Sequence, residues 1–206
     1  MDPAAGRPDM DARSDEELMT AIGQGDQRAF AGLVERHSRR AAALAARITL
    51  NRGDAEDVVQ EAFLRVWIKA PNWRPQDRTG GAQFSTWFHR ILVNLSIDRR
   101  RKPATDGLDA AGELADQKPS ALDTLAESET SRRVAAAVAD LPERQRAALA
   151  LCHFEGMSNI EAAEVLGLSV GAVESLLVRA RRALKESLAD LAPPGALAAK
   201  KTGGPR

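Results

Sequence analysis

Apolar side chains recur every three or four residues through most of the chain, the spacing that lines one face of an α-helix. A first helix is predicted to begin at Asp15, because Ser14 and Glu17 form a capping box. After the turn residues 23–26 a second helix is predicted from Gln27. Its apolar face keeps the same spacing and consists of Phe30, Leu33, Val34, His37, Ala41, Leu44 and Ile48. Few stretches alternate with a period of two, so the pattern favours an all-helical protein.

Two more helices are predicted in the first half of the chain. The first runs from Ala55 to about Ala70, with Asp54 as its N-cap, and buries Val58, Val59, Ala62, Phe63 and Val66. Prolines and glycines exclude a helix through residues 71–83. The last helix then carries a buried stripe of Phe84, Phe88, Ile91, Leu92 and Leu95, and ends in the basic run 99–102. The four helices predict one small bundle over residues 15–102.

Residues 103–130 have a different composition from the helices around them. They are rich in alanine, proline, glycine and acids and hold few large apolar groups, which predicts a flexible, extended linker. Helical spacing resumes over residues 131–190. The ends, 1–14 and 191–206, are predicted to be disordered tails. The predicted fold is therefore all-α, with two small helical bundles on a flexible acidic linker.

The segment Ser158–Arg182 has the pattern of a helix-turn-helix. Ser158 and Glu161 form a second capping box, and small Ala163 and Gly167 fall at positions five and nine of the motif. Glycine permits the left-handed turn that aims the second helix. Such a motif places its second helix in the DNA major groove. From the pattern alone, an ordinary helical hairpin stays open as the alternative.

The second helix of this motif directs a distinct set of side chains outward. Val173, Leu177, Ala180 and Leu184 are predicted to face inward. The residues of this helix predicted to contact DNA are Val170, Gly171, Glu174, Ser175, Val178, Arg179 and Arg182. A carboxylate such as Glu174 repels phosphate but can accept a hydrogen bond from cytosine N4. The other open interpretation of Glu174 is a solvated surface charge.

Charge is arranged in blocks although the formal net charge is zero. The net charge is −3 over residues 15–62, +7 over 63–102, −6 over 103–130 and zero over 131–190. The +7 block also holds six of the eight aromatic residues: Phe63, Trp67, Trp73, Phe84, Trp87 and Phe88. Basic and aromatic side chains in one segment are typical of surfaces that bind unpaired nucleic acid.

Two blocks of sequence carry a family resemblance. "DAEDVVQEAFLRVW" at residues 54–67, followed by "FSTWFHRILVNLSIDRRRK" at 84–102, resembles region 2 of the bacterial sigma-70 superfamily. Residues 141–184 resemble region 4. With these two regions alone, the chain is similar to extracytoplasmic-function (ECF) sigma factors. The resemblance implies a subunit that binds core RNA polymerase and promoter DNA, melts the duplex, and answers a stress or envelope signal under an anti-sigma factor.

The resemblance also implies roles for particular residues. Polymerase binding falls on one polar face of the third helix, at Asp57, Gln60, Glu61, Leu64 and Arg65; a solvated face is the alternative from the pattern alone. Minus-35 binding falls on the seven DNA-contacting residues of the helix-turn-helix given above. Minus-10 binding falls on Trp73, Arg74, Trp87, Arg90, Asn94, Arg99, Arg100 and Arg101. In this interpretation the tryptophans stack on bases, Asn94 bonds a flipped base, and the arginines at 99–101 hold phosphate.

The recognition helix departs from the family pattern. Family members often have "GTVKSRLHRAR" where this chain has "GAVESLLVRAR". Glu174, Leu176 and Val178 thus replace lysine, arginine and histidine. We expect weaker phosphate binding by this domain, and its base preference cannot be transferred from common members.

Other chemistry is not indicated. The three histidines are scattered, Cys152 is alone, and no cofactor, metal site, catalytic set or small-molecule substrate is expected. The chain is predicted not to be an enzyme and not to insert in a membrane, and to be cytoplasmic. Two alternative functions stay open: a sigma-like decoy that binds an anti-sigma factor, and a stand-alone helix-turn-helix transcription regulator.

Overall fold

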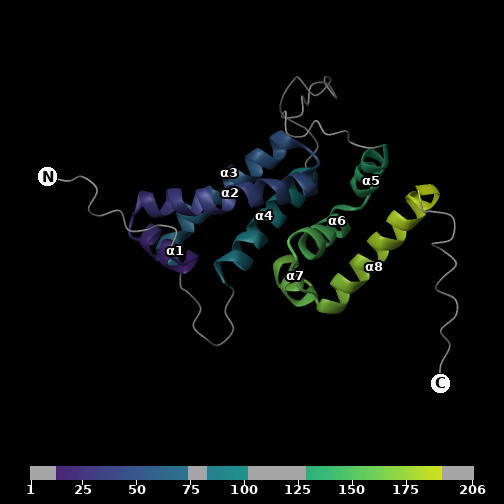
Figure 1. Cartoon of the computed structure of the whole chain (residues 1–206). Helices are drawn as coiled ribbons and strands as arrows, with labels where there is room; N and C mark the ends of the chain where they lie inside the picture. Colours follow the sequence, from purple (N-terminus) through teal and green to yellow (C-terminus); the bar gives the residue numbers. More distant parts are fainter. Residues whose placement is uncertain (1–12, 74–82, 102–128, 192–206) are drawn as a thin grey trace.

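The computed structural model describes residues 13–73, 83–101 and 129–191, which form helices without any strand in those ranges (Figure 1). The first domain consists of α1 (Asp15–Gly23), α2 (Gln27–Thr49), α3 (Arg52–Lys69), the short turn η2 (Ala70–Asn72) and α4 (Phe84–Arg101). The second consists of α5 (Glu129–Ala139), α6 (Glu143–Leu149), η3 (Ala150–Phe154), α7 (Asn159–Leu166), α8 (Val170–Ser187) and η4 (Ala189–Leu191). The prediction of an all-α fold with two helical bundles is confirmed.

Several helix boundaries follow from local capping, and one prediction about them is wrong. The capping box at Ser14 is present, and α1 begins at Asp15 as expected. The third helix begins at Arg52 rather than Ala55, because Asn51 and not Asp54 is its N-cap. The Asn51 side chain accepts a 2.9 Å hydrogen bond from the backbone N–H of Asp54. An asparagine in extended backbone satisfies an otherwise unpaired N–H, so the helix gains three residues.

The boundary of the predicted linker also shifts. Glu129 and Thr130 belong to α5, so the helix begins two residues before the predicted start at Ser131. The rest of that linker, and the two predicted tails apart from Arg13, Ser14 and Leu191, lie outside the described residues. The loop expected at 71–83 is described only at its ends, where η2 carries the chain to Trp73.

Aromatic rings from three helices form the centre of the first domain. Phe84 and Phe88 of α4 are buried and stacked, with ring centroids 5.4 Å apart. Phe63 of α3 lies 5.0 Å from Phe88, and His37 of α2 lies 5.3 Å from Phe84. The predicted stripe on α4 is therefore largely correct, although Ile91 and Leu95 are only half-buried.

The two domains pack directly against each other. Helix α4 lies against α7 and α6, and the C-terminal part of the first domain's α2 meets α6 and η3. Val93 and Ile97 are buried in addition to the predicted stripe of α4. They follow Arg90 at intervals of three and four, and Arg90 bonds to α7. α4 thus has a second buried face, which a single amphipathic stripe does not predict.

Candidate nucleic-acid and polymerase interface

The helix-turn-helix is built by two N-caps and one left-handed residue. Ser158 Oγ accepts from the backbone N–H of Glu161 at 3.2 Å, and Glu161 Oε2 accepts from the N–H of Ser158 at 2.7 Å. Gly167 ends α7 with φ 62°, a conformation that a Cβ makes costly. Ser169 then caps α8 by accepting from Ala172 N–H at 3.2 Å. Sequence reasoning missed the Ser169 cap, although serine directly before an apolar periodic run is a standard signal.

The outer face of α8 is exposed as predicted. Val173, Leu177 and Ala180 are buried, and all seven candidate minus-35 residues are exposed: Val170, Gly171, Glu174, Ser175, Val178, Arg179 and Arg182. Arg179 Nε donates to the Ser175 carbonyl at 3.1 Å, and Arg182 forms an exposed ion pair with Glu186 at 2.8 Å. Because these contacts lie at the surface, phosphate can replace them at little cost.

The two candidate base-stacking tryptophans form one aromatic surface. The rings of Trp73 and Trp87 lie 5.1 Å apart, and Phe84 lies 6.0 Å from Trp87. Both tryptophans are half-buried, so neither is enclosed in the core and neither is fully exposed. Asn94 is exposed on the same helix as Trp87. Arg74, assigned to this surface from the sequence, lies outside the described residues.

The arginines of α4 differ in what they contact. Arg90 Nε donates to the backbone carbonyl of Glu164 in α7 at 3.1 Å, and its Nη2 donates to the same oxygen. Arg99 bridges Asp54 and Asp57 of α3 at 2.8 and 2.7 Å, and the hydrogen bond to Asp54 raises the pKa of Arg99. Arg100 is exposed. Arg101 ends α4, and its side chain is outside the described residues.

The polar face of α3 presents the residues assigned to polymerase binding. Asp57, Gln60 and Arg65 are exposed, and Glu61 is half-buried. Arg65 and Glu61 pair along the helix at 2.9 Å. Leu64 is 51% exposed and Ile68 is 57% exposed beside them. Exposed aliphatic residues flanked by charges are the composition expected of a helix-on-helix contact.

Titratable groups elsewhere have structural partners. Asp15 accepts from Arg36 at 2.6 Å and lies 2.8 Å from His37 Nε2. Burial opposes ionisation of Asp15, but the hydrogen bonds from His37 and Arg36 outweigh it and lower the carboxyl pKa. Burial raises the pKa of the Cys152 thiol and lowers the pKa of His89. Within the described ranges, the His, Cys, Asp and Glu side chains form no cluster suited to a metal ion.

No helix among the described residues has the length and apolar content needed to cross a bilayer.

Two regions of the chain match known protein families. Residues 33–105 match the family described as Sigma-70 region 2, and residues 131–184 match Sigma-70, region 4. These ranges contain α3 and α4 in the first domain and the helix-turn-helix in the second. The chain therefore has the two promoter-binding regions of the sigma-70 family in their usual order.

Individual relatives show to which group within the sigma-70 family the chain belongs. The chain is 36% identical over 186 residues to the ECF RNA polymerase sigma factor SigM of Mycobacterium tuberculosis, covering 90% of each chain. It is 31% identical over 181 residues to SigW of Bacillus subtilis, covering 82% of this chain and 94% of that protein. The chain belongs to the ECF RNA polymerase sigma factors.

Solved structures agree with this family. CnrH, solved in complex with the cytosolic domain of CnrY, has 33% identity and a TM-score of 0.61, with 87% of this chain and 99% of that chain covered. RpoE of Bartonella quintana, solved with the anti-sigma factor NepR, shares the fold with a TM-score of 0.59.

Proposed function

We propose that this protein is an alternative sigma factor that binds core RNA polymerase, recognises minus-10 and minus-35 promoter elements and promotes DNA melting. The observation that carries the proposal is the joint presence of the two sigma-70 regions and a capped helix-turn-helix whose recognition face is exposed. As in the family, it acts as a transcription regulator and not as an enzyme, in the cytoplasm where polymerase works.

Minus-35 recognition is assigned to the N-terminal half of α8. Val170, Gly171, Glu174 and Ser175 stand on the first turns, from which a recognition helix contacts base edges. Arg179 and Arg182 follow on the same outer face and contact phosphate. With Glu174 in place of a cation, the sequence-independent part of this binding is small, and discrimination depends on the carboxylate.

Minus-10 recognition and strand opening are assigned to the aromatic surface of the first domain. Trp73 and Trp87 offer open ring area on which an unpaired base can stack. Asn94 supplies both a donor and an acceptor for the edge of a flipped base. Arg90, Arg99 and Arg100 supply phosphate contacts, the first two after release from their protein partners.

Polymerase binding is assigned to the exposed face of α3, with Leu64 as its apolar centre and Asp57, Gln60, Glu61 and Arg65 around it. Control by an anti-sigma factor in a stress or envelope response is proposed from the relatives. CnrH, which this chain resembles over most of its length, was solved with the cytosolic domain of another protein, CnrY.

Run-off transcription tests the proposal. The full chain is added to core polymerase on a library of genomic fragments, and we expect discrete transcripts that are absent with core polymerase alone. Leu64→Asp is expected to abolish them, whereas Arg52→Ala, at an exposed position on the same helix, leaves them unchanged. A stand-alone regulator binds DNA but gives no transcripts, and a decoy binds neither polymerase nor promoter. Either result rejects the proposal.

A further inference from the structure

The two tryptophans proposed to stack on bases come from separate elements. Trp73 directly follows the turn η2, and Trp87 is the fourth residue of α4. Their ring centroids lie 5.1 Å apart, and the Phe84 ring lies 6.3 Å from Trp73 and 6.0 Å from Trp87. The shape of this aromatic surface therefore depends on how η2 is placed relative to α4.

Helix α1 contacts both of these elements. Glu16 reaches the start of α4, and Gly23 packs against η2. The two residues lie seven positions apart, which is two helical turns, so they share one face of α1. Two contacts on one face of a rigid helix can hold the two elements at a fixed separation.

The rest of the first domain holds α1 itself in place. Leu18, Met19 and Ile22 of α1 are buried in the core. At the start of the helix, the Asp15 carboxylate pairs with Arg36 of α2 at 2.6 Å. Because α1 is fixed by both an apolar face and an ion pair, it can serve as a support for other elements.

The contact of Glu16 with α4 is a hydrogen bond to the helix N-terminus. Glu16 is half-buried, and its Oε1 accepts from the backbone N–H of Phe84 at 3.2 Å. This N–H is the first of α4, so it has no partner within the helix. A carboxylate at this position both satisfies the N–H and interacts favourably with the helix dipole. The bond thus fixes the first turn of α4, with Trp87, relative to α1.

The contact of Gly23 with η2 is a close approach of two backbones. A Cβ at Gly23 would lie 2.7 Å from the carbonyl oxygen of Ala70 and 3.4 Å from Pro71 Cα. Only a glycine leaves room for η2 at this distance. The same Ala70 oxygen accepts a 3.0 Å hydrogen bond from the backbone N–H of Trp73. The atom that touches Gly23 is therefore the atom that holds Trp73.

From these contacts we infer that Glu16 and Gly23 are positioning residues for minus-10 recognition, which set the relative placement of Trp73 and Trp87 on which an unpaired base stacks. The inference rests on the proposed function, because base stacking on these tryptophans is itself proposed. Helix α1 then takes part in promoter recognition through the two elements that it supports.

Circular dichroism of the free full chain reports the geometry of the tryptophan pair. Two indole rings whose centroids lie 5.1 Å apart give an exciton couplet, which changes with their distance and angle. Comparison with Trp87→Phe identifies the contribution of this pair. We expect Glu16→Ala and Gly23→Ala each to lose couplet amplitude. Glu16→Gln retains it, because the amide oxygen can still accept from the Phe84 N–H.

Binding of the holoenzyme to the unpaired non-template minus-10 strand reports the effect on function. By fluorescence anisotropy, we expect Glu16→Ala and Gly23→Ala to weaken binding by about 3- to 10-fold, which is part of the roughly 5- to 150-fold that one stacked base contributes. Glu16→Gln is expected to bind within about 2-fold of wild type. Binding of minus-35 duplex through α8 stays unchanged in all three variants.

Two controls separate positioning from charge and stability. Glu17→Ala removes the same charge from the same helix, together with the 2.7 Å bond from the Ser14 N–H, but leaves the contact with α4. It is expected to lower stability in urea and to keep both the couplet and the strand affinity. Gly53→Ala adds a methyl group to a helical glycine of α3, where Asn51 Oδ1 at 3.4 Å is an ordinary neighbour. It should alter neither readout.

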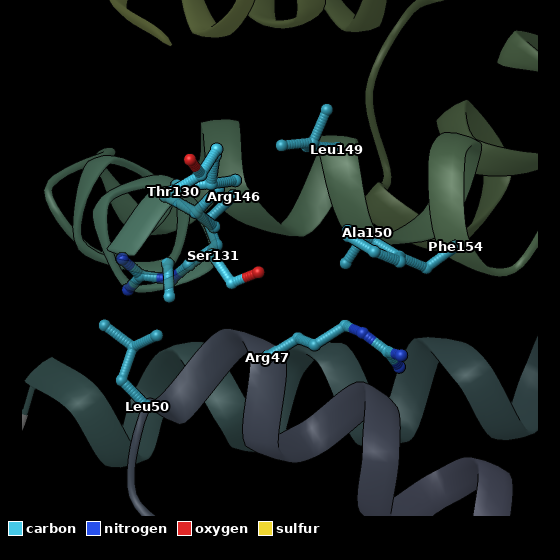
Figure 2. Close-up of a pocket in the computed structure, with 11 residues that line it drawn as sticks. Arg47, Leu50, Thr130, Ser131, Arg146, Leu149, Ala150 and Phe154 are labelled. Atoms are coloured by element: carbon cyan, nitrogen blue, oxygen red, sulfur yellow. The ribbon is translucent and has the colours of Figure 1, made fainter. Parts of the chain in front are cut away.

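A third control lies at the opposite end of α2. Figure 2 shows Arg47 beside a groove of about 450 Å³, whose lining comes from the end of α2 and from α5, α6 and η3. The Arg47 guanidinium lies 4.5 Å from the centroid of the Phe154 ring. Arg47 is about 30 Å along α2 from Gln27, the residue at which α2 begins after α1. Arg47→Ala removes a contact with the second domain but none with α1, so the couplet and the strand affinity should not change.

The outcomes distinguish this inference from the proposed function. An unaltered couplet in both Glu16→Ala and Gly23→Ala overturns the inference, and so does an altered couplet without loss of strand affinity. Losses in Glu17→Ala as large as those in Glu16→Ala also overturn it, because general loosening of α1 would then explain both. In each of these cases wild-type holoenzyme still binds the strand. If wild-type holoenzyme does not bind it, the proposed function fails and the inference fails with it.

Discussion

The two DNA-binding helices of this sigma factor differ in how much of each is already open to DNA. Helix α8 presents its whole candidate face to solvent, and on that face Arg179 and Arg182 bond to Ser175 and Glu186 of the same helix. Helix α4 is buried on two sides, with Arg90 bonded to α7 and Arg99 to α3. The face proposed for minus-35 binding is therefore open in this structure, whereas the face proposed for minus-10 binding would have to exchange protein contacts for DNA contacts.

The largest expected effect concerns the core that holds the minus-10 face. Phe88 is 2% exposed and packs on Phe63 and Phe84. Phe88→Ala is expected to lower the free energy of unfolding in urea by about 3–5 kcal/mol, through lost burial and the cavity left behind. Phe154→Ala, at a half-exposed phenylalanine of the second domain, is the control and should cost less than about 1 kcal/mol. Equal losses would mean that the first domain has no special dependence on its aromatic core.

Next in size is the loss of a stacking surface. Trp87→Ala is expected to weaken binding of the holoenzyme to the unpaired non-template minus-10 strand by about 1–3 kcal/mol, measured by fluorescence anisotropy. Trp67→Ala is the matched control. Trp67 lies on α3, and its ring centroid is 5.2 Å from that of Phe30 on α2, away from the Trp73–Trp87 surface. If Trp67→Ala weakens DNA binding as much as Trp87→Ala does, the aromatic surface is structural and not a base-binding site.

A third prediction concerns the role of the Glu174 carboxylate on α8. If Glu174 accepts a hydrogen bond from cytosine N4, Glu174→Ala, which removes the acceptor, reduces discrimination at one minus-35 position by about 1–3 kcal/mol. Glu174→Lys instead raises affinity for all duplexes and steepens the salt dependence by about one phosphate contact. Competition binding to a set of minus-35 duplexes that differ at single bases distinguishes a change in discrimination from a change in overall affinity. Unchanged discrimination in Glu174→Ala identifies Glu174 as a solvated charge.

The smallest expected effect lies at the start of the helix-turn-helix. Ser158→Ala removes the reciprocal bonds with Glu161, and we expect a loss of about 1 kcal/mol in the stability of the second domain, measured by urea unfolding. Ser187→Ala, at the exposed end of α8, is the control and should change stability by a few tenths of a kcal/mol at most. If Ser158→Ala lowers the stability of the second domain no more than Ser187→Ala does, the Ser158 cap does not stabilise that domain.

The sequence predicted best those features that depend on neighbours in the chain. The caps at Ser14 and Ser158, the left-handed Gly167 and the outward face of α8 all follow from residues within a few positions of each other. Asn51 was missed because Asp54 offered an equally good local signal, and only the extended backbone of Asn51 decides between them.

Long-range features were beyond the sequence pattern. The spacing of apolar residues on α4 showed one buried face, but Val93 and Ile97 are buried as well, on the side of the helix where Arg90 contacts the second domain. Arg146 lies on the short helix α6, and nothing in its neighbours indicates that it binds the Ile48 carbonyl of α2, about a hundred residues earlier in the chain. The roles proposed for the polymerase-binding and DNA-binding residues stay predictions.

We assign strand opening at the minus-10 element to the first domain and recognition of the minus-35 duplex to the second. This assignment is tested most directly by permanganate footprinting of a promoter mixed with core polymerase and the full chain. The account predicts reactive thymines at the minus-10 element with wild-type protein and a sharp reduction with Trp87→Ala. It also predicts that Glu174 variants alter occupancy without moving the melted region. Promoter DNA that stays unreactive with folded wild-type protein and active core polymerase would contradict it.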